Sequence, residues 1–486
     1  MSSTEQITTG IAGLDRLLRG GLRRGGLHLI VGEPGVGKTV LAHQIGAFHA
    51  RAGRQVLYLT AVVETHQTLL SQFRTFSFFD PSIVSHTFYY ASLTAALQTE
   101  GLPGVHREIA RLVPERAPAL LMLDGLQGIR EIAEKPAEYH RFLTFLQAQC
   151  SSTGATGLLI ANREGVDTAD PMYTVSDAIL ALDTLQSVRR RIRTIEVRKL
   201  RGVHHLTGVH LLRITGSGVE VFPRLEALVA DQPPEETPVY GRVRFGIDGL
   251  DAMVGGGLGS GAVTLVTGTP GAGKTSIGLS FLAAGIEAGE GGLFVGFHET
   301  PDRLLTKADA LGLPLRAGVQ SGGVRFQWWP SADLLVDCVA QRVLETVERH
   351  GIRRVIIDGA NDLVRGLAEP ARAVPFLNAF MDLLRARGVA VLLTQELSQI
   401  FSLDFVMPLP DVSAAVDNIV LLRYVELDGR LRRLLSILKV RDQEYDSSVR
   451  EFSLSGQGIR IGDTFDRAGR AAGGSSRPRA GEGTDA

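Results

Sequence analysis

One eight-residue pattern, G-x-x-x-x-G-K-[ST], occurs twice in this chain, at corresponding places about 235 residues apart. It reads GEPGVGKT over residues 32–39 and GTPGAGKT over residues 268–275, and each copy follows an apolar run and precedes a helical pattern. Glycines in this context let backbone N–H groups close around phosphate oxygens, and the N-terminus of the following helix adds partial positive charge. The chain is therefore predicted to bind two nucleoside triphosphates.

The chemistry of each loop rests on its glycines, its lysine and its threonine. The lysine reaches the β- and γ-phosphates, and the threonine hydroxyl can ligate Mg²⁺. The residues predicted to bind the nucleotide are Gly32, Gly35, Gly37, Lys38, Thr39, Gly268, Gly271, Gly273, Lys274 and Thr275. Thr39 and Thr275 are also predicted metal ligands.

The two patterns belong to a longer internal repeat, which indicates a duplication of whole domains. The segment TGIAGLD at 9–15 matches FGIDGLD at 245–251, and a glycine-rich turn follows each. The predicted organisation is a first domain over 1–227, an acidic, proline-rich linker over 228–240, a second domain over 241–467 and a disordered tail over 468–486.

Short apolar runs alternate with helical segments in each copy, a pattern typical of a parallel sheet covered by helices on both faces. The expected parallel strands are 27–31, 55–60, 119–123 and 157–161, then 263–266, 292–297, 354–357 and 389–393. The expected antiparallel strands are 179–185, 193–200, 418–425 and 431–441. The predicted fold class is α/β, with two tandem P-loop domains that each carry a mainly parallel sheet and C-terminal antiparallel strands.

A single carboxylate ends one apolar strand in each copy, at Asp124 and Asp358. Aspartate at such a place beside a phosphate loop holds Mg²⁺ through water, as in the Walker B arrangement. A plain Asp-Gly turn at the end of a strand is the structural alternative. Because each copy also has a phosphate loop upstream, we favour the metal role.

A glutamate is expected to end the second strand of each copy, at Glu64 and Glu299. A carboxylate there can orient or deprotonate an attacking nucleophile. The alternative is a charge at the start of a helix, because Glu-Thr-Pro-Asp also suits an N-terminus. We favour the catalytic role.

Lysine is rare in this chain, with six lysines against forty-five arginines, yet four of the six form repeat-matched pairs. Two are the phosphate-loop lysines, and the others begin the motifs Lys199-Leu200-Arg201 and Lys439-Val440-Arg441. Strand alternation predicts that the lysine and arginine of each motif project together. Such cations can neutralise charge on a transferred phosphoryl group, whereas the alternative is a charge-protected strand edge.

Composition excludes several other classes of protein. A net charge of −1 provides no overall field for nucleic acid or an anionic membrane, and no apolar run approaches the ~20 residues that a bilayer requires. The N-terminus lacks the basic and apolar regions of a signal peptide. We therefore expect a cytoplasmic protein without membrane contact.

Together these motifs resemble the KaiC family, the double-domain RecA-like ATPases of the bacterial circadian clock and their relatives outside clocks. The resemblance runs from about Thr9 to Phe465 and includes Val175-Ser176-Asp177 and Tyr424-Val425-Glu426. It implies a hexameric double ring with ATP and Mg²⁺ bound between neighbouring subunits. It also implies that the Lys-x-Arg motifs act across the subunit interface.

The chain departs from the clock members of that family at two places. Those members carry two adjacent glutamates after the second strand, and the first position is Val63 in one copy and His298 in the other. His298 can accept a proton near neutral pH. Clock members also phosphorylate an adjacent Ser-Thr pair, which here is Ser413 and Ala414, so only Ser413 is a candidate phosphoacceptor.

The leading hypothesis is a ring-forming Mg·ATPase, with serine autokinase activity at Ser413, that acts as a regulatory switch towards an unidentified signalling partner. One alternative is a RadA- or RecA-like ATPase stimulated by nucleic acid, against which the near-neutral charge argues. Another is an ATP-gated scaffold with little hydrolysis, because Val63 and His298 stand where the family has its base. Fold alone does not separate these functions.

Overall fold

The computed structural model describes residues 5–61, 66–163, 170–187, 190–231, 233, 241–397, 415–427, 429–441 and 443–465. The chain divides into two compact units, residues 1–233 and 234–486, so the division falls within the expected linker. Helix α8 (Leu225–Asp231) makes the first part of that linker, 228–231, helical rather than extended. The domain boundaries at 227 and 241 stay predictions, and the tail 468–486 lies outside the described residues.

The N-terminal unit is built on a nine-stranded sheet. Its strands are β3 (Leu27–Gly32), β4 (Val56–Thr60), β5 (Phe88–Ser92), β6 (Leu120–Asp124), β7 (Thr156–Asn162), β8 (Ala178–Ser187), β9 (Arg190–Leu200), β10 (Val209–Thr215) and β11 (Gly218–Phe222). Strands β1 (Gln6–Ile7) and β2 (Leu22–Arg23) form a separate small pair. The helices are α1 (Ala12–Leu17), α2 (Lys38–Arg51), α3 (His66–Phe73), α4 (Thr94–Arg116), α5 (Leu126–Ile132), α6 (Pro136–Thr153), α7 (Pro171–Val175) and α8.

The C-terminal unit repeats this plan with its own nine-stranded sheet. Its strands are β14 (Val263–Gly268), β15 (Gly291–Gly296), β16 (Val324–Trp328), β17 (Ile352–Asp358), β18 (Ala390–Glu396), β19 (Asn418–Leu427), β20 (Arg430–Lys439), β21 (Arg450–Ser455) and β22 (Gly458–Thr464). Strands β12 (Arg242–Val243) and β13 (Leu258–Gly259) form the small pair. The helices are α9 (Asp248–Met253), α10 (Lys274–Glu287), α11 (Pro301–Ala310), α12 (Leu315–Gln320), α13 (Val336–His350), α14 (Ala360–Gly366) and α15 (Ala373–Arg385).

Both sheets place the strand before the phosphate loop in the middle. The order is β11-β10-β9-β8-β3-β7-β6-β4-β5 in the first sheet and β16-β15-β17-β18-β14-β19-β20-β21-β22 in the second. The strands from β8 to β5 run parallel, and β8 to β11 pair antiparallel; the second sheet has the same arrangement. The predicted fold class is therefore confirmed.

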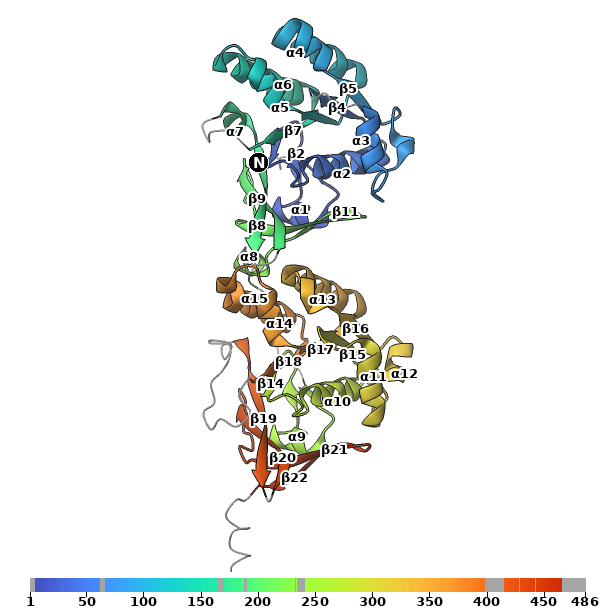
Figure 1. The fold of residues 1–486 in the computed structure, drawn as a ribbon, viewed down its shortest axis with the longest axis vertical. Coiled ribbons are helices and arrows are strands. Elements are labelled where there is room, and N and C mark those ends of the chain that lie inside the picture. Colours follow the sequence, from blue (N-terminus) through green and yellow to red (C-terminus); the bar gives the residue numbers. More distant parts are fainter. Residues whose placement is uncertain are drawn as a thin grey trace, which may run out of the picture. The chain divides into compact units, whose positions relative to one another are not determined.

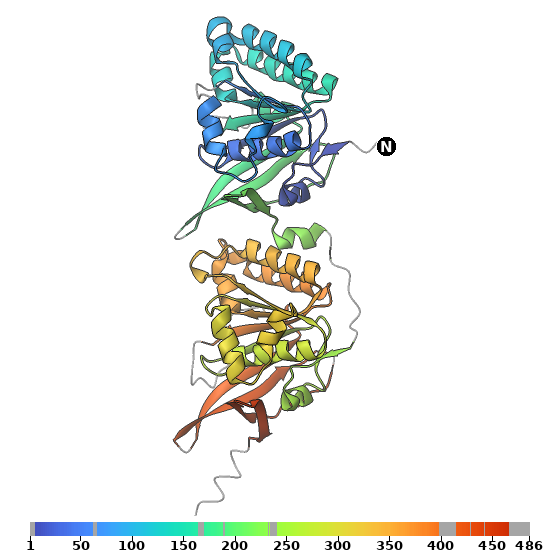
Figure 2. The ribbon, with the colours of Figure 1, turned by 90° about the vertical axis from the view of Figure 1, so that its right-hand side faces the viewer.

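Helices cover both faces of the sheet in each unit (Figures 1 and 2). In the N-terminal unit, Ile30 of β3 packs in a core with α1 and α2, whereas its neighbours Leu29 and Val31 pack in a second core with α4, α5 and α6. Successive strand residues face opposite sides, so a strand buried on both faces must be apolar throughout. This requirement explains why the central strands were recognisable in the sequence. No helix in the described part of the chain is long and apolar enough to cross a bilayer.

The repeated G-x-x-G-L-D motif fixes the start of each unit. The carboxylate of Asp15 accepts hydrogen bonds from the backbone N–H and the hydroxyl of Thr9, both 2.7 Å long. Asp251 accepts from the backbone N–H groups of residues 245–247 in the same way. A Cβ on Gly13 would lie 1.8 Å from the carbonyl oxygen of Val221, so glycine lets α1 pack directly on β11.

Candidate functional site

The first phosphate loop joins β3 to α2 at the carboxyl edge of the sheet. Gly35 and Gly37 have φ angles of +81° and +109°, a region that favours glycine. The ammonium of Lys38 lies inside the loop, where Nζ donates to the carbonyl oxygens of Gly32 at 2.9 Å and Glu33 at 2.8 Å. Because burial leaves this ammonium less well hydrated than that of a surface lysine, the pKa of Lys38 is lowered.

The second loop, between β14 and α10, repeats this geometry. Gly271 and Gly273 have φ angles of +73° and +109°. Nζ of Lys274 donates to the carbonyl oxygens of Gly268 at 2.8 Å and Thr269 at 2.9 Å, and burial lowers the pKa of Lys274. Both lysines therefore occupy the position in which an anion enclosed by the loop would meet a compact positive charge.

Each loop threonine faces the aspartate that ends the neighbouring strand. Thr39 Oγ1 lies 3.4 Å from Asp124 Oδ2, and Thr275 Oγ1 lies 3.0 Å from Asp358 Oδ2. Mg²⁺ prefers oxygen ligands at about 2.1 Å in octahedral geometry, which places neighbouring ligands about 3 Å apart. The two oxygen pairs therefore fit Mg²⁺ or its water shell. Burial raises the pKa of both aspartates, and a bound cation would compensate the buried negative charge.

The two aspartates are held by different donors. Tyr58 on β4 donates from its hydroxyl to Asp124 Oδ2 at 2.8 Å, whereas Thr394 on β18 donates to Asp358 Oδ1 at 2.6 Å. The position that corresponds to Tyr58 in the C-terminal unit is Phe294, and sheet register places Ile160 where the other unit has Thr394. The donor thus comes from the strand on one side of the aspartate in the N-terminal unit and from the strand on the other side in the C-terminal unit, and each aspartate has two hydroxyl partners.

Of the two predicted catalytic glutamates, the structure describes only Glu299. Glu64 and Val63 lie outside the described residues. Strand β15 ends at Gly296, so Glu299 lies in the loop before α11 and not at the end of the strand. Both carboxylate oxygens of Glu299 accept from Nζ of Lys307, at 2.7 and 2.9 Å.

His298 also has a specific partner. Its Nε2 lies 2.9 Å from Oδ2 of Asp362 on α14. The His298 side chain is 66% exposed, whereas that of Asp362 is 12% exposed. Because β15 pairs with β17 so that Gly296 lies beside Asp358, this contact is adjacent to the candidate metal site of the C-terminal unit.

In the N-terminal unit, the lysine and the arginine of the Lys-x-Arg motif both donate to the same backbone carbonyl oxygen. Nζ of Lys199 donates to the carbonyl oxygens of Tyr173 at 2.8 Å and Thr174 at 3.1 Å, and the Arg201 guanidinium donates to the same Thr174 oxygen at 2.7 Å. Burial lowers the pKa of Lys199, and Arg201 lowers it further. The two cations are therefore close together, as predicted.

The C-terminal motif is arranged in a similar way. Nζ of Lys439 donates to the carbonyl oxygen of Val416 at 2.8 Å, and Arg441 forms an ion pair with Asp417 at 3.2 Å. Strands β9 and β20 end at Leu200 and Lys439, so both arginines lie beyond the strands. Local contacts, and not the alternation assumed from the sequence, bring each pair together.

A β-bulge precedes both motifs. On β8, Ile179 pairs with Lys199 and Leu180 pairs with Val197, so Arg198 of β9 is an extra residue in the pairing. Leu438 of β20 is the corresponding extra residue in its pairing with β19. Bulges re-aim side chains next to functional sites. The same irregularity therefore occurs directly before Lys199 and Lys439 in the two units.

Both motifs lie at the end of the sheet opposite to their own phosphate loop. Asp177 Oδ2 accepts from the backbone N–H of Leu27, the first residue of β3, and Arg201 lies 3.7 Å from the same carboxylate. The loop begins at Gly32, five residues further along, and a strand rises about 3.3 Å per residue, so ~16 Å separate the two ends. Asp417 and Val263 repeat this contact at 2.9 Å in the C-terminal unit.

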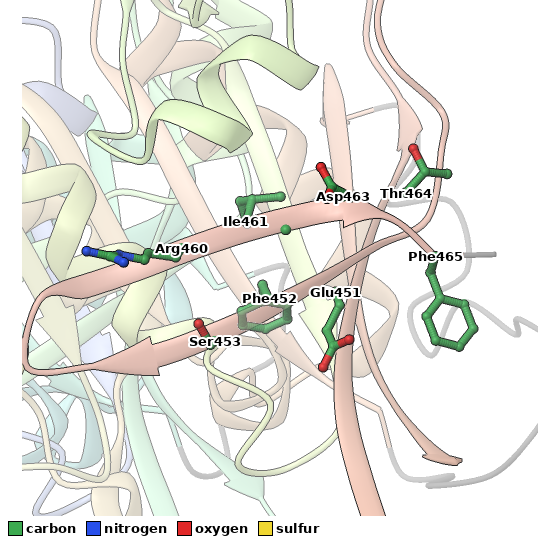
Figure 3. A pocket seen from close by; sticks show the side chains of 9 residues that line it. Glu451, Phe452, Ser453, Arg460, Ile461, Asp463, Thr464 and Phe465 are labelled. Atoms are coloured by element: carbon green, nitrogen blue, oxygen red, sulfur yellow. The ribbon is translucent and has the colours of Figure 1, made fainter. Parts of the chain in front are cut away.

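Ser413, the candidate phosphoacceptor, lies outside the described residues. A pocket of about 490 Å³ lies on the hairpin of β21 and β22. Figure 3 shows its lining side chains along the two strands. The pocket contains none of the predicted site residues.

Sequence reasoning missed several residues that the structure brings into the sites. They are Tyr58, Thr394, Lys307, Asp362 and the aspartate Asp417 that binds Arg441. For Asp417 a signal existed, since it matches Asp177 in the repeat. Tyr58, Thr394 and Asp362 have no counterpart of the same type in the other copy, so the repeat gave no signal for them.

A family model described as "ATPase: KaiC" matches residues 7–226 and again residues 243–465. The chain is also similar to the circadian clock oscillator protein KaiC of Parathermosynechococcus lividus, with 26% identity over 94% of this chain and 85% of that protein. The circadian clock protein KaiC3 of Synechocystis is 26% identical over 95% of this chain and 92% of its own length. Both similarities extend across the two units.

Proposed function

Because the chain belongs to the KaiC family of ATPases, we propose that it is a Mg²⁺-dependent ATPase with one ATP site in each unit. The observation that supports this most directly is the repeated meeting of a loop lysine with a Thr–Asp oxygen pair at the carboxyl edge of each sheet. Slow hydrolysis at these sites switches contacts between subunits, and the assembly acts as a regulatory switch for a signalling protein.

Each site residue has a distinct role in this proposal. Lys38 and Lys274 bind the β- and γ-phosphates, and the loop glycines let backbone N–H groups approach the phosphate oxygens. Thr39 with Asp124, and Thr275 with Asp358, would hold Mg²⁺, which would neutralise phosphate charge at each site. Glu64 and Glu299 orient the attacking water in their respective units.

The Lys-x-Arg motifs act on the ATP of a neighbouring subunit. This assignment is supported by their position at the opposite end of the sheet from their own loop, ~16 Å away by strand geometry. A contact between one surface and a different surface of the next copy closes into a ring when the rotation allows it. We propose a hexamer, as in the family, in which Lys199, Arg201, Lys439 and Arg441 complete the adjacent sites.

Autophosphorylation of Ser413 is the finer part of the proposal. Ser413 occupies one of the two acceptor positions of clock members, and Ala414 removes the other. A single-site modification would therefore replace a two-site cycle. Mass spectrometry of the full chain after incubation with Mg·ATP tests this, and an unmodified Ser413 would contradict it.

Counting bound ATP tests the main proposal. Equilibrium dialysis with Mg·ATP should give two ATP molecules per wild-type chain, one for either Lys38→Ala or Lys274→Ala and none for the double variant. Phosphate release and light scattering, measured on the same samples with and without ATP, test hydrolysis and assembly. Retention of both nucleotides by the double variant would refute the assignment of the sites.

Two other outcomes would point to different functions. Full ATP binding without phosphate release would favour an ATP-gated scaffold. Hydrolysis that rises strongly on addition of DNA, with binding that weakens steeply as salt rises, would favour a nucleic-acid motor. Glu64→Gln and Glu299→Gln should both slow phosphate release, and unchanged turnover would exclude the respective glutamate.

A further inference from the structure

The contact between His298 and Asp362 determines which nitrogen of the imidazole carries a proton. Nε2 lies 2.9 Å from the Asp362 carboxylate, and a carboxylate only accepts hydrogen bonds, so the hydrogen of a neutral imidazole is on Nε2. Nδ1 then carries a lone pair. A histidine held in this way by an aspartate is the arrangement that enzymes use to orient a base.

This pair lies beside the candidate metal site of the C-terminal unit. Gly296 pairs with Asp358 across β15 and β17, and His298 follows two residues later. Gly359, which follows Asp358, has φ +129°, and a Cβ there would lie 2.7 Å from Asp362 Oδ2. The Asp362 carboxylate therefore lies against the backbone next to Asp358, where a side chain at residue 359 would displace it.

The neighbouring glutamate is already engaged. Both carboxylate oxygens of Glu299 face the ammonium of Lys307, at 2.7 and 2.9 Å. Both oxygens therefore already accept hydrogen bonds from this ammonium, and a water molecule would have to compete with Lys307 for them. His298 is the more exposed of the two side chains, at 66% against 31% for Glu299, and is more accessible to water.

The N-terminal unit lacks both members of the pair. The residue before its glutamate is Val63, and the helix position that corresponds to Asp362 is Gly128. Valine and glycine provide no proton acceptor and no carboxylate to orient one. The difference between the two units therefore involves both partners together.

We propose that His298, oriented by the positioning residue Asp362, accepts the proton of the attacking water at the C-terminal ATP site, and that Val63 and Gly128, at the corresponding positions of the N-terminal unit, supply no equivalent. The water oxygen forms a bond to the γ-phosphorus, the bond between that phosphorus and the β–γ bridging oxygen breaks, and ADP leaves. The water proton moves to Nδ1 of His298 and then to solvent. This inference rests on the proposed ATPase function and names the proton acceptor of one of its sites.

The test measures phosphate release in the full chain carrying Lys38→Ala, so that only the C-terminal site binds ATP. His298→Gly should lower kcat by on the order of 100-fold, because general-base catalysis contributes about 10²–10⁴-fold. Added imidazole should restore release in a concentration-dependent way, since the side chain it replaces is exposed. His350→Ala, an exposed histidine at the end of α13, is the matched control and should leave kcat unchanged.

Asp362→Asn tests the positioning role separately. It keeps the size of the side chain but no longer fixes the tautomer, so kcat should fall about tenfold or more with little change in KM for ATP. Normal release by His298→Gly, or a loss that imidazole does not restore, would overturn the assignment while leaving the ATPase proposal intact. Absence of phosphate release from the wild-type chain would refute the proposed hydrolysis itself.

Discussion

Tyr58 donates a 2.8 Å hydrogen bond to Asp124, and the C-terminal unit replaces it with a bond from Thr394 to Asp358. The two donors come from strands on opposite sides of the strand that carries the aspartate, since β6 lies between β4 and β7 and β17 between β15 and β18. The two units therefore orient their buried carboxylates with different residues. Comparison of the two halves by sequence could not reveal this.

Removal of either donor should weaken Mg²⁺ binding in its own unit alone. Loss of a partner that orients a metal ligand lowers metal affinity about 10–100-fold. Tyr58→Phe should therefore raise the Mg²⁺ concentration for half-maximal ATP binding at the N-terminal site, and Thr394→Val should do so at the C-terminal site. Mg²⁺ titrations in Lys274→Ala and Lys38→Ala chains measure the two sites separately, and each substitution serves as a control for the other.

The central strands and the phosphate loops could be predicted from the sequence, because burial on both faces requires apolar runs and phosphate binding requires glycines. The edge strands β5 and β16 escaped notice, since edge positions such as Tyr89 and Gln327 relax that requirement. The bulges before Lys199 and Lys439 were also missed, because a register shift leaves no trace in hydrophobic periodicity. Unmatched partners such as Asp362 depend on tertiary proximity, which neither spacing nor repeats encode.

The N-terminal unit should lose stability in mild acid because of His28. This imidazole is fully buried, and burial lowers its pKa to about 4, although the backbone carbonyl oxygen of Arg23 accepts a hydrogen bond from its Nε2 and Asp177 lies nearby. Between pH 6.5 and 4 the unfolded chain binds a proton that the folded chain excludes, so the free energy of unfolding falls as pH drops through this window. The difference between the ordinary pKa of 6.5 and the folded value of about 4 corresponds to ~3 kcal/mol of free energy of unfolding.

The substitution His28→Leu isolates this effect. Leucine is apolar and does not titrate, so thermal unfolding of the N-terminal unit should change less between pH 6.5 and 4 in the variant than in the wild type. Equal acid sensitivity in the two proteins would assign the effect to other groups. The C-terminal unit has Thr264 at this position and provides an internal comparison.

The first glycine of the phosphate loop is required for packing before any nucleotide binds. A Cβ on Gly32 would lie 2.4 Å from the backbone carbonyl oxygen of Leu182 on β8, a contact that real structures do not tolerate. Gly32→Ala should therefore lower the free energy of unfolding by about 1–3 kcal/mol without nucleotide. Gly216→Ala, where a Cβ meets nothing within 4 Å, is the matched control, and equal melting temperatures for the two variants would contradict this explanation.

Mixing of two inactive chains tests whether Arg201 acts on a neighbouring subunit. In a Lys274→Ala background, Lys38→Ala removes ATP from the N-terminal site and Arg201→Ala removes the cation that lies ~16 Å from its own loop. In a mixed ring, an intact loop from the Arg201→Ala chain meets an intact Arg201 from the Lys38→Ala chain, so phosphate release should exceed that of either chain alone.

The control for that experiment replaces the Lys38→Ala partner with a chain that carries both Lys38→Ala and Arg201→Ala. No interface in this second mixture combines an intact loop with an intact arginine, so release should stay at the level of the separate chains. If Arg201 acted within its own subunit, neither mixture would recover activity, because no single chain contains both groups. Recovery in the first mixture alone therefore requires that the site be completed by a second copy of the chain.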